Sequence, residues 1–441
     1  MKFALIALLL ISGLLLFGCT NQMQPIPSPT PTISPSATII PSSTPIPTSI
    51  PSPTSIPSVS ISPSDLAMAD ANNKFAFDFY SQIKDKEAGN LFFSPFSISE
   101  AFAILAEGAK GITASELQGV FGLDPDSAIR QNGFKDLNTR LNARNEAYKL
   151  SVANSLWIEK TYPILNAYKA TASDFYGSEI RNVDFKNNAE GSRNTINDWV
   201  EEKTNDKIVD LLPQGSVDFG TRLVIANAIY FKGTWIKAFD KKDTLEGEFR
   251  LEGGQKAKAQ YMYRNDKDAV FNYMENEQLQ VLEMPYKGDS LSMLVLLPKD
   301  GELAGLERSL TVEKLGQWKS GMSQRRIDLI FPKFKFDDGY SLKENLMAMG
   351  VGDVFSEGAD LSGIDGTLGL SVTGAYHKAF VEVNEEGTEA AAATGIVVGI
   401  TAIMPQYIPE FKADHPFIFL IQEKATGVIL FMGKVANPLL E

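Results

Sequence analysis

Side chains that could carry out catalysis are scarce in this chain of 441 residues. Histidine occurs only as His377 and His415, and the single cysteine is Cys19. No GxSxG nucleophile elbow, P-loop or HExxH zinc motif is present. One cysteine cannot form an intrachain disulfide or a metal site of clustered thiolates. Both histidines are more simply explained as hydrogen-bonded structural residues, so the sequence predicts a protein that is not an enzyme and needs no cofactor or metal.

The composition is that of a globular protein with an acidic balance. Hydrophobic residues make up 44% of the chain and charged residues 22%, and the formal net charge is −13. No run of Lys or Arg stands out, which argues against a nucleic-acid partner. The length allows one large domain or two ordinary ones.

The N-terminus has the pattern of an export signal. Lys2 is followed by an apolar run from Phe3 to Phe17, and the segment ends in Leu-Phe-Gly-Cys at Cys19. This ending resembles a prokaryotic lipobox, although Phe17 is bulkier than the residue usual at its place. We therefore expect residues 1–19 to be a signal, with lipidated Cys19 anchoring an exported protein at the cell surface. The alternatives are an ordinary cleaved signal peptide and an uncleaved anchor.

A separate compositional zone follows at residues 20–64. It is rich in Pro, Ser and Thr and contains no charged residue. Such a segment cannot bury a core, so we expect a disordered linker with polyproline II character. Its simplest role is that of a passive spacer.

Periodicity predicts that the folded part begins near Asp65 and runs to Glu441, with helices early and strands late. The expected helices are a first one near 65–83, then 96–107, 113–121, 127–144 and 189–204. The expected strands are 222–231, 280–286, 290–298, 326–336, 417–423 and 428–435. This order is typical of an α+β fold and not of βαβ alternation.

The stretch VEVNEEGTEAAAATGIVVG (381–399) is ambiguous between helix and strand. Helix-favouring residues lie between two strand-like runs, and Gly387 interrupts them. With a period of two, Thr388 and alternate residues up to Ile400 share a face that has no charged residue. On the opposite face, Glu389 is the only charged residue. That pattern suits a strand that can enter a sheet without burying an ion. The alternative is an exposed helix with Thr388 as its N-cap.

Six segments in order resemble the serpin family and cover nearly all of the globular part. They are NLFFSPFSISEAFAIL (90–105), GAKGITASEL (108–117), NAIYFKGTW (227–235), LEMPYKGDSLSMLVLLP (282–298), PKFKF (332–336) and DHPFIFLIQEKATGVILFMGKVANP (414–438). The resemblance implies about eight or nine helices around a large central mixed sheet, two smaller sheets and an exposed reactive loop at about 385–410. It also implies a monomer that traps a target serine protease covalently.

In serpins, a protease cleaves the reactive loop, and the loop then inserts into the central sheet while it is still bound to the protease as an acyl-enzyme. The resemblance places the hinge of that loop at nine residues: Glu385, Glu386, Gly387, Thr388, Glu389, Ala390, Ala391, Ala392 and Ala393. Together they match the hinge pattern of inhibitory members closely. A non-inhibitory binding or structural serpin and an inhibitor of cysteine proteases are the alternatives.

Counting from the hinge places the bait residue at Thr401 and the scissile bond before Ala402. Ile400, Ile403 and Met404 are alternatives because the loop is a few residues longer than in many serpins. No Lys or Arg lies between Lys378 and Lys412. A trypsin-like target is therefore disfavoured, and an elastase-like or subtilisin-like protease fits better.

The resemblance also implies residues that hold the sheet closed before the loop inserts. Those expected beneath the opening of the sheet, in the shutter, are Ser94, Ser97, Asn227 and His377. Lys333 should pair with Glu385 of the hinge, and Trp235 should lie near the top of the sheet, in the breach. Plain core packing is the alternative explanation for Trp235.

Overall fold

The computed structural model describes residues 61–86, 89–142, 148–388 and 407–440. Everything given below belongs to one compact unit that starts at Ser58. Several residues that the sequence singled out lie outside the described residues. They are Cys19, the hinge residues Glu389, Ala390, Ala391, Ala392 and Ala393, and the candidate bait residues Ile400, Thr401, Ala402, Ile403 and Met404.

Ten α-helices occur in the described residues. They are α1 (Pro63–Ile83), α2 (Pro95–Ala106), α3 (Gly111–Phe121), α4 (Ser127–Asn142), α5 (Asn166–Tyr176), α6 (Phe185–Thr204), α7 (Leu303–Ser309), α8 (Val312–Ser320), α9 (Lys343–Met349) and α10 (Ser362–Asp365). Three short 3₁₀ helices lie at Lys241–Asp243, Glu252–Gly254 and Asp353–Phe355. Helix α1 starts at Pro63 because Ser62 and Asp65 form a capping box there.

The largest sheet by strand number has seven strands, and every neighbouring pair in it is antiparallel. In spatial order its strands are β1 (Leu91–Phe93), β17 (Ile429–Val435), β16 (Phe417–Glu423), β9 (Leu291–Pro298), β8 (Leu279–Pro285), β7 (Val270–Glu275) and β10 (Ser323–Arg326). Strands β9, β16 and β17 are buried along their whole length, which explains their uninterrupted apolar sequences.

The second sheet is mixed and contains the long strands of the molecule. Its order is β12 (Phe334–Ser341), β13 (Val372–Val383), β4 (Leu223–Thr234), β2 (Tyr148–Glu159) and β3 (Glu179–Val183), and β14 (Gly387–Thr388) pairs with β4 beside this path. The third sheet has the order β15 (Glu410–Lys412), β11 (Asp328–Pro332), β6 (Lys256–Arg264) and β5 (Thr244–Arg250).

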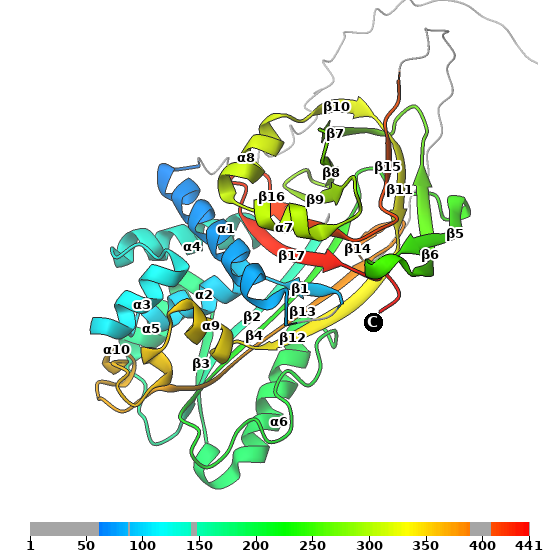
Figure 1. Cartoon of the computed structure of the whole chain (residues 1–441). Helices are drawn as coiled ribbons and strands as arrows, with labels where there is room; N and C mark the ends of the chain where they lie inside the picture. Colours follow the sequence, from blue (N-terminus) through cyan, green and yellow to red (C-terminus); the bar gives the residue numbers. More distant parts are fainter. Residues whose placement is uncertain (1–60, 87–88, 143–147, 389–406, 441) are drawn as a thin grey trace, which may run out of the picture. The chain divides into compact units, whose positions relative to one another are not determined.

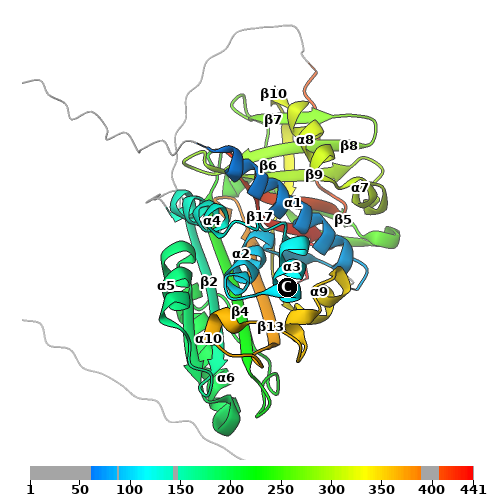
Figure 2. The same cartoon turned by 90° about the vertical axis from the view of Figure 1, so that its left-hand side faces the viewer.

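The mixed sheet is covered on both faces. Helices α1 to α5 gather on one side, whereas α6 lies apart from them (Figures 1 and 2). Alternate residues of β4 divide accordingly, because successive side chains of a strand point to opposite faces. Ile225, Ile229 and Phe231 belong to the main core. Val224 and Tyr230 pack in a smaller cluster with side chains of α6.

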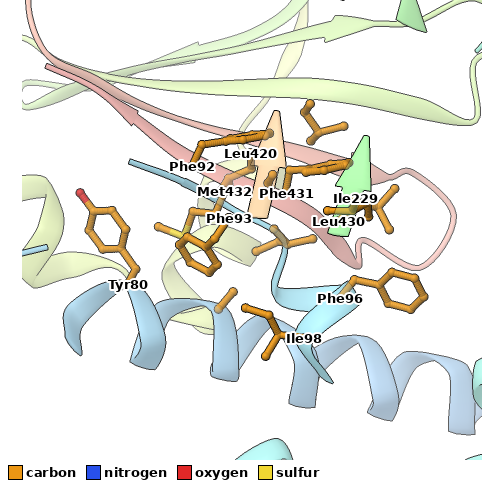
Figure 3. Close-up of a cluster of buried hydrophobic side chains, with 14 of the residues drawn as sticks. Tyr80, Phe92, Phe93, Phe96, Ile98, Ile229, Leu420, Leu430, Phe431 and Met432 are labelled. Carbon is orange, nitrogen blue, oxygen red and sulfur yellow. The ribbon is translucent and has the colours of Figure 1, made fainter. Parts of the chain in front are cut away.

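The main core fills the space between the helices and the two larger sheets. Figure 3 shows Phe92 and Phe93 of β1, Phe96 and Ile98 of α2, Ile229 of β4 and residues of β16 and β17 meeting there. Phe92 stacks on Phe431, with ring centroids 5.3 Å apart. Helix α2 is therefore fixed against both sheets at its N-terminal end.

The expected α+β fold with three sheets is confirmed, with two differences in detail. The described residues hold ten α-helices instead of eight or nine, and the mixed sheet has one strand fewer than the antiparallel sheet. The expected single strand 326–336 is divided at Lys333 between β11 and β12, which belong to different sheets. Sequence reasoning also missed β2, the neighbour of β4 in the mixed sheet.

Candidate functional site

The mixed sheet contains a parallel contact between two strands whose other neighbours are antiparallel. Strand β13 pairs with β4 in parallel, with Ala375 opposite Ile225 and His377 opposite Asn227. On the far sides, β12 is antiparallel to β13, and β2 is antiparallel to β4. A further strand could therefore enter between β4 and β13 and be antiparallel to both.

A buried polar network crosses this contact at its middle. His377 lies on β13 and Asn227 on β4, and neither is exposed to solvent. The His377 Nδ1–H donates to Asn227 Oδ1. The backbone N–H of Ser94 donates to His377 Nε2 over 3.0 Å. Because Nε2 is an acceptor, the ring is neutral, and burial lowers its pKa to about 3.

The same network ties the sheet to the first turn of α2. The Asn227 amide group donates to the carbonyl of Ser97 over 2.9 Å and to its hydroxyl over 2.6 Å. Ser94 is the N-cap of α2, and its hydroxyl donates to the carbonyl of Leu430 over 2.5 Å. Four residues expected in the shutter, Ser94, Ser97, Asn227 and His377, thus meet in one place.

The chain turns back sharply where β13 ends. Asn384 and Gly387 form a bridge, and β14 then pairs antiparallel with the end of β4, with Gly387 opposite Thr234. Gly387 has φ +145°, and a Cβ there would lie 2.0 Å from the carbonyl oxygen of Gly233. Glycine is therefore required at this turn both by its backbone angle and by the close approach of β4.

Glu385, just before that turn, is buried and pairs with a lysine that reaches solvent. Its carboxylate accepts hydrogen bonds from Lys333 Nζ at 2.9 and 3.0 Å and from the Thr244 hydroxyl at 2.8 Å. Burial acts to raise the pKa of Glu385, but the Lys333 ammonium and the other hydrogen bonds outweigh it and hold the pKa below its ordinary value. The expected pairing of Lys333 with Glu385 is thus present in the geometry.

Glu386 and Trp235 fix the other side of the turn. Glu386 pairs with Lys241 at 2.6 Å, and its carbonyl accepts from the backbone N–H of Trp235 at 2.9 Å. The Trp235 ring stacks on Tyr286 at 4.5 Å, and its Nε1–H donates to the carbonyl of Asn384 at 3.1 Å. Trp235 therefore combines core packing with a hydrogen bond to the hinge.

Four contributors to these two clusters were missed by sequence reasoning. Asn154 of β2 accepts from Asn227 through its Oδ1 and donates to Glu100 of α2 at 2.6 Å. Thr244 and Lys241 bind the two hinge glutamates. Glu100 gave a signal in the sequence, because it is the only charged residue in the run from Leu91 to Ala106.

The two histidines lie in different environments. His415 is outside the network, and its ring nitrogens contact Asp414 Oδ1 at 2.9 Å and the carbonyl of Pro298 at 2.7 Å. Within the described part of the chain, no group of three His, Cys, Asp or Glu residues could hold a metal ion. No helix among the described residues is long and apolar enough to span a bilayer.

Comparisons with known proteins agree with this architecture. The family model for serpins, described as serine protease inhibitors, matches residues 70–438. An uncharacterized serpin-like protein of Methanosarcina mazei is 42% identical over 379 residues, which cover 84% of this chain and 87% of the relative. Leukocyte elastase inhibitor A of Mus musculus is 42% identical over 380 residues, which cover 84% of this chain and 99% of the relative.

Solved structures give the same result. Uncleaved ovalbumin matches with a TM-score of 0.76 and 34% identity, over 84% of this chain and 100% of ovalbumin. The family match covers the strands β4 and β13, the shutter network and both ends of the loop. On this evidence of sequence and fold, the chain is a member of the serpin family.

Proposed function

We propose that this serpin inhibits serine endopeptidases by acting as a suicide substrate. The observation that carries the proposal is the parallel contact of β4 with β13, together with β14, which already pairs antiparallel with β4 at its open end. A loop that follows β14 needs only to continue in the same direction to enter between the two strands.

The chemistry of the proposal belongs to the protease. Its serine hydroxyl attacks the carbonyl carbon of Thr401, an ester forms, and the amine of Ala402 leaves with the serine proton. Insertion of the loop then carries the bound protease away from its encounter position and distorts its active site, so that water does not hydrolyse the ester. The serpin supplies the bait and the free energy of insertion.

Continuing the register of β14 assigns the inserted residues to faces of the sheet. Thr388 lies opposite Gly233, so Ala392 would lie opposite Ile229 and Thr394 opposite Asn227. Paired residues of neighbouring strands point to the same face. Alternate residues from Thr388 would therefore face the main core, and these are the uncharged positions of the loop.

The one charge on the opposite face also fits this register. Glu389 would lie beside Lys232 on the half-exposed end of β4. A cross-strand pair of opposite charges is favourable there by about 0.2–1 kcal/mol. The loop sequence is thus compatible with insertion at every position from Thr388 to Thr394.

The driving force of insertion is large. Entry replaces one ladder of hydrogen bonds between β4 and β13 with two, and each hydrogen bond contributes about 1 kcal/mol net. About ten new bonds give on the order of ten kcal/mol, which is comparable with the stability of a whole domain, about 5–15 kcal/mol. The uncleaved form is then held kinetically, above its lowest free energy.

The target is an elastase-like or subtilisin-like protease. Small and β-branched residues around Thr401 suit such pockets, and the absence of Lys and Arg from 379 to 411 disfavours a trypsin-like enzyme. Relatives at about 40% identity include leukocyte elastase inhibitors of mouse and human.

The experiment is to mix the protein with a subtilisin-like and an elastase-like protease and to look for a covalent complex on a denaturing gel. Mass spectrometry of the released C-terminal fragment identifies the cleaved bond, which we expect at Thr401–Ala402. Cleavage without any complex would contradict inhibition and would favour a non-inhibitory serpin.

We further propose that the protein is exported and held at the membrane by lipidated Cys19, with residues 20–64 as spacer. The lipobox-like ending at the only cysteine of the chain supports this proposal. Replacing Cys19 with serine should release the protein from the membrane fraction, and an unchanged distribution would argue against the anchor.

A further inference from the structure

A buried carboxylate lies at one end of the hydrogen-bond network that joins β4 to β13. Glu100 is on α2 and is 1% exposed. Its Oε2 accepts a hydrogen bond from the Asn154 side chain of β2 at 2.6 Å, and its Oε1 accepts one from the Asn138 side chain of α4. Each carboxylate oxygen therefore has a neutral amide as its partner.

This carboxylate can only accept hydrogen bonds when it is ionised, so it determines which group donates and which accepts along the whole network. Because the Asn154 amide group donates to Glu100, its Oδ1 is left to accept from Asn227. Asn227 Oδ1 in turn accepts from His377, and His377 Nε2 accepts from the backbone of Ser94. Every donor along this line points towards Glu100.

Among the described residues, no salt bridge joins a Lys, Arg or His side chain to Glu100. The arginines of α4 have other partners, since Arg130 pairs with Glu107 and Arg140 pairs with Asp65 of α1. Lys135 of α4 lies over the ring of Phe175, and Lys149 of β2 bonds with Asn205. The elements packed against α2 are α1, α3, α5, β2, β4 and β17. Besides the groups already given, their titratable residues are Asp70, Lys74, Asp78 and Tyr80 of α1, Glu116 of α3, Tyr168, Lys169, Asp174 and Tyr176 of α5, Tyr148 and Glu159 of β2, Tyr230 and Lys232 of β4, and Lys434 of β17.

Burial without a cation favours the protonated form of a carboxylic acid. It raises the pKa of Glu100 to about 7, although the two amide hydrogen bonds act in the opposite direction. The group therefore changes its charge within the neutral pH range.

We propose that Glu100 is a positioning residue for the sheet: its carboxylate holds Asn154, and through Asn154 it holds Asn227 and His377 in the orientation that keeps β4 joined to β13. The inference deepens the proposed function, because the loop enters between these strands. Opening requires β2 and β4 to move relative to α2, and this movement breaks the bond between Asn154 and Glu100. Losing that bond costs more when Glu100 is ionised, because hydrogen bonds to charged groups are the stronger ones.

Ionisation of Glu100 then has opposite effects on two quantities: it lowers the free energy of unfolding and raises the free energy needed to open the sheet. The pKa of Glu100 is higher in the folded protein than in the unfolded chain, so protonated Glu100 favours the native state. This stabilisation is lost as pH rises from about 4.5 to about 7. The same ionisation makes the sheet harder to open, because the charge stays buried in the opened molecule. If Glu100 had only a structural role, its ionisation would change the stability towards unfolding and the resistance to sheet opening in the same direction.

The test compares the wild-type protein with Glu100→Gln at pH 5.5 and pH 8, without any protease. Hydrogen exchange is measured at the backbone amides of β4 and β13, and rates are compared between variants at the same pH. At pH 8 the variant should exchange about five- to tenfold faster than wild type, and at pH 5.5 the two should be alike. The melting temperature of the variant should nevertheless exceed that of wild type at pH 8.

Two further variants keep the test decisive. Ser99→Ala changes the residue that precedes Glu100 in α2, which is also buried and lies outside the network. The ratio of its exchange rate to that of wild type should stay near one at both pH values. Asn138→Ala removes only the outer amide of Glu100 and should move the pH dependence of exchange to higher pH. Equal exchange of Glu100→Gln and wild type at both pH values, or no pH shift in Asn138→Ala, would overturn the proposal. Because no protease is used, these results are independent of whether a covalent complex forms.

Discussion

The contact between β4 and β13 is secured differently at its middle and at its hinge end. At the middle, His377 and Asn227 are completely buried, and the direct link between the strands is made by neutral groups. At the hinge end, two buried glutamates pair with lysines that reach solvent: Lys333 is 37% exposed and Lys241 is 66% exposed. The middle thus resembles a protein core, and the hinge end resembles a surface.

This difference indicates an order of opening. Exposed ion pairs contribute little and are screened by salt, whereas leaving a buried polar group without its partner is expensive. The hinge end is therefore suited to release the first residues of the loop, and the buried network sets the resistance to further entry. The following changes test that division, from the largest expected effect to the smallest.

Thr388→Arg should have the largest effect. In the proposed inserted register, position 388 would face the main core, and an arginine there would bury an unpaired charge at a cost of several kcal/mol. Insertion should become too slow to trap a protease, so the variant should be cleaved as a substrate without forming a covalent complex. Thr388→Ser, which is small and neutral, is the matched control. Unaltered inhibition by the arginine variant would disprove entry through this register.

Asn227→Ala should strongly destabilise the uncleaved form. The substitution leaves the Nδ1–H of His377 without its acceptor and removes the Asn227 donor from Asn154 Oδ1, at a cost of about 2–4 kcal/mol. The nicked form should lose less, because insertion already separates β4 from β13. Thermal unfolding of both forms measures the difference, and equal losses would show that the network does not act specifically on the closed sheet.

Lys333→Met should have a smaller effect that depends on pH. The pKa of Glu385 is held below its ordinary value, so the ion pair contributes stability above the ordinary carboxyl range, and this contribution is lost as pH falls through the folded pKa. We expect a loss of about 1 kcal/mol at neutral pH, after allowance for solvent screening, and convergence with wild type in acid. Lys335→Met, an exposed lysine on β12, serves as control. A pH-independent loss would mean that packing, and not charge, is responsible.

Lys241→Met should have the smallest effect of the four. Its ammonium pairs with Glu386 from an exposed position, so the bond competes with water and salt. We expect a slight fall in melting temperature at low ionic strength. It should disappear in 0.5 M salt, where charges are screened over roughly 4 Å. If the fall persists in high salt, the hinge end is not governed by surface electrostatics.

The sequence predicted the parts of the site that depend on motif and periodicity. Ser94, Ser97, Asn227 and His377 were placed together through a family resemblance, and the geometry brings them into one network. Glu100 and Asn154 were missed because they contact each other only when α2 packs on β2. Neither a glutamate in an apolar helix nor an asparagine in an unrecognised strand indicates that contact by itself. Contacts between elements distant in the chain cannot be read from local pattern.

The strand pattern shows the same limit. The buried strands β9, β16 and β17 were predicted because long apolar runs identify them. Strand β2 was missed because none of its first five residues is fully buried and they are less apolar. Gly387 was expected to interrupt the helix-favouring run and to lie in the hinge, but the close approach of Gly233, which makes glycine necessary there, is visible only in the fold.

The central claim is that the intact protein is held above its lowest free energy until the loop is cut. Calorimetric melting of the intact molecule and of the molecule nicked in its loop tests it most directly. We predict that the nicked form melts tens of degrees higher, as expected for a gain on the order of ten kcal/mol. If nicking leaves the melting temperature unchanged or lowers it, the loop does not insert and the account is wrong.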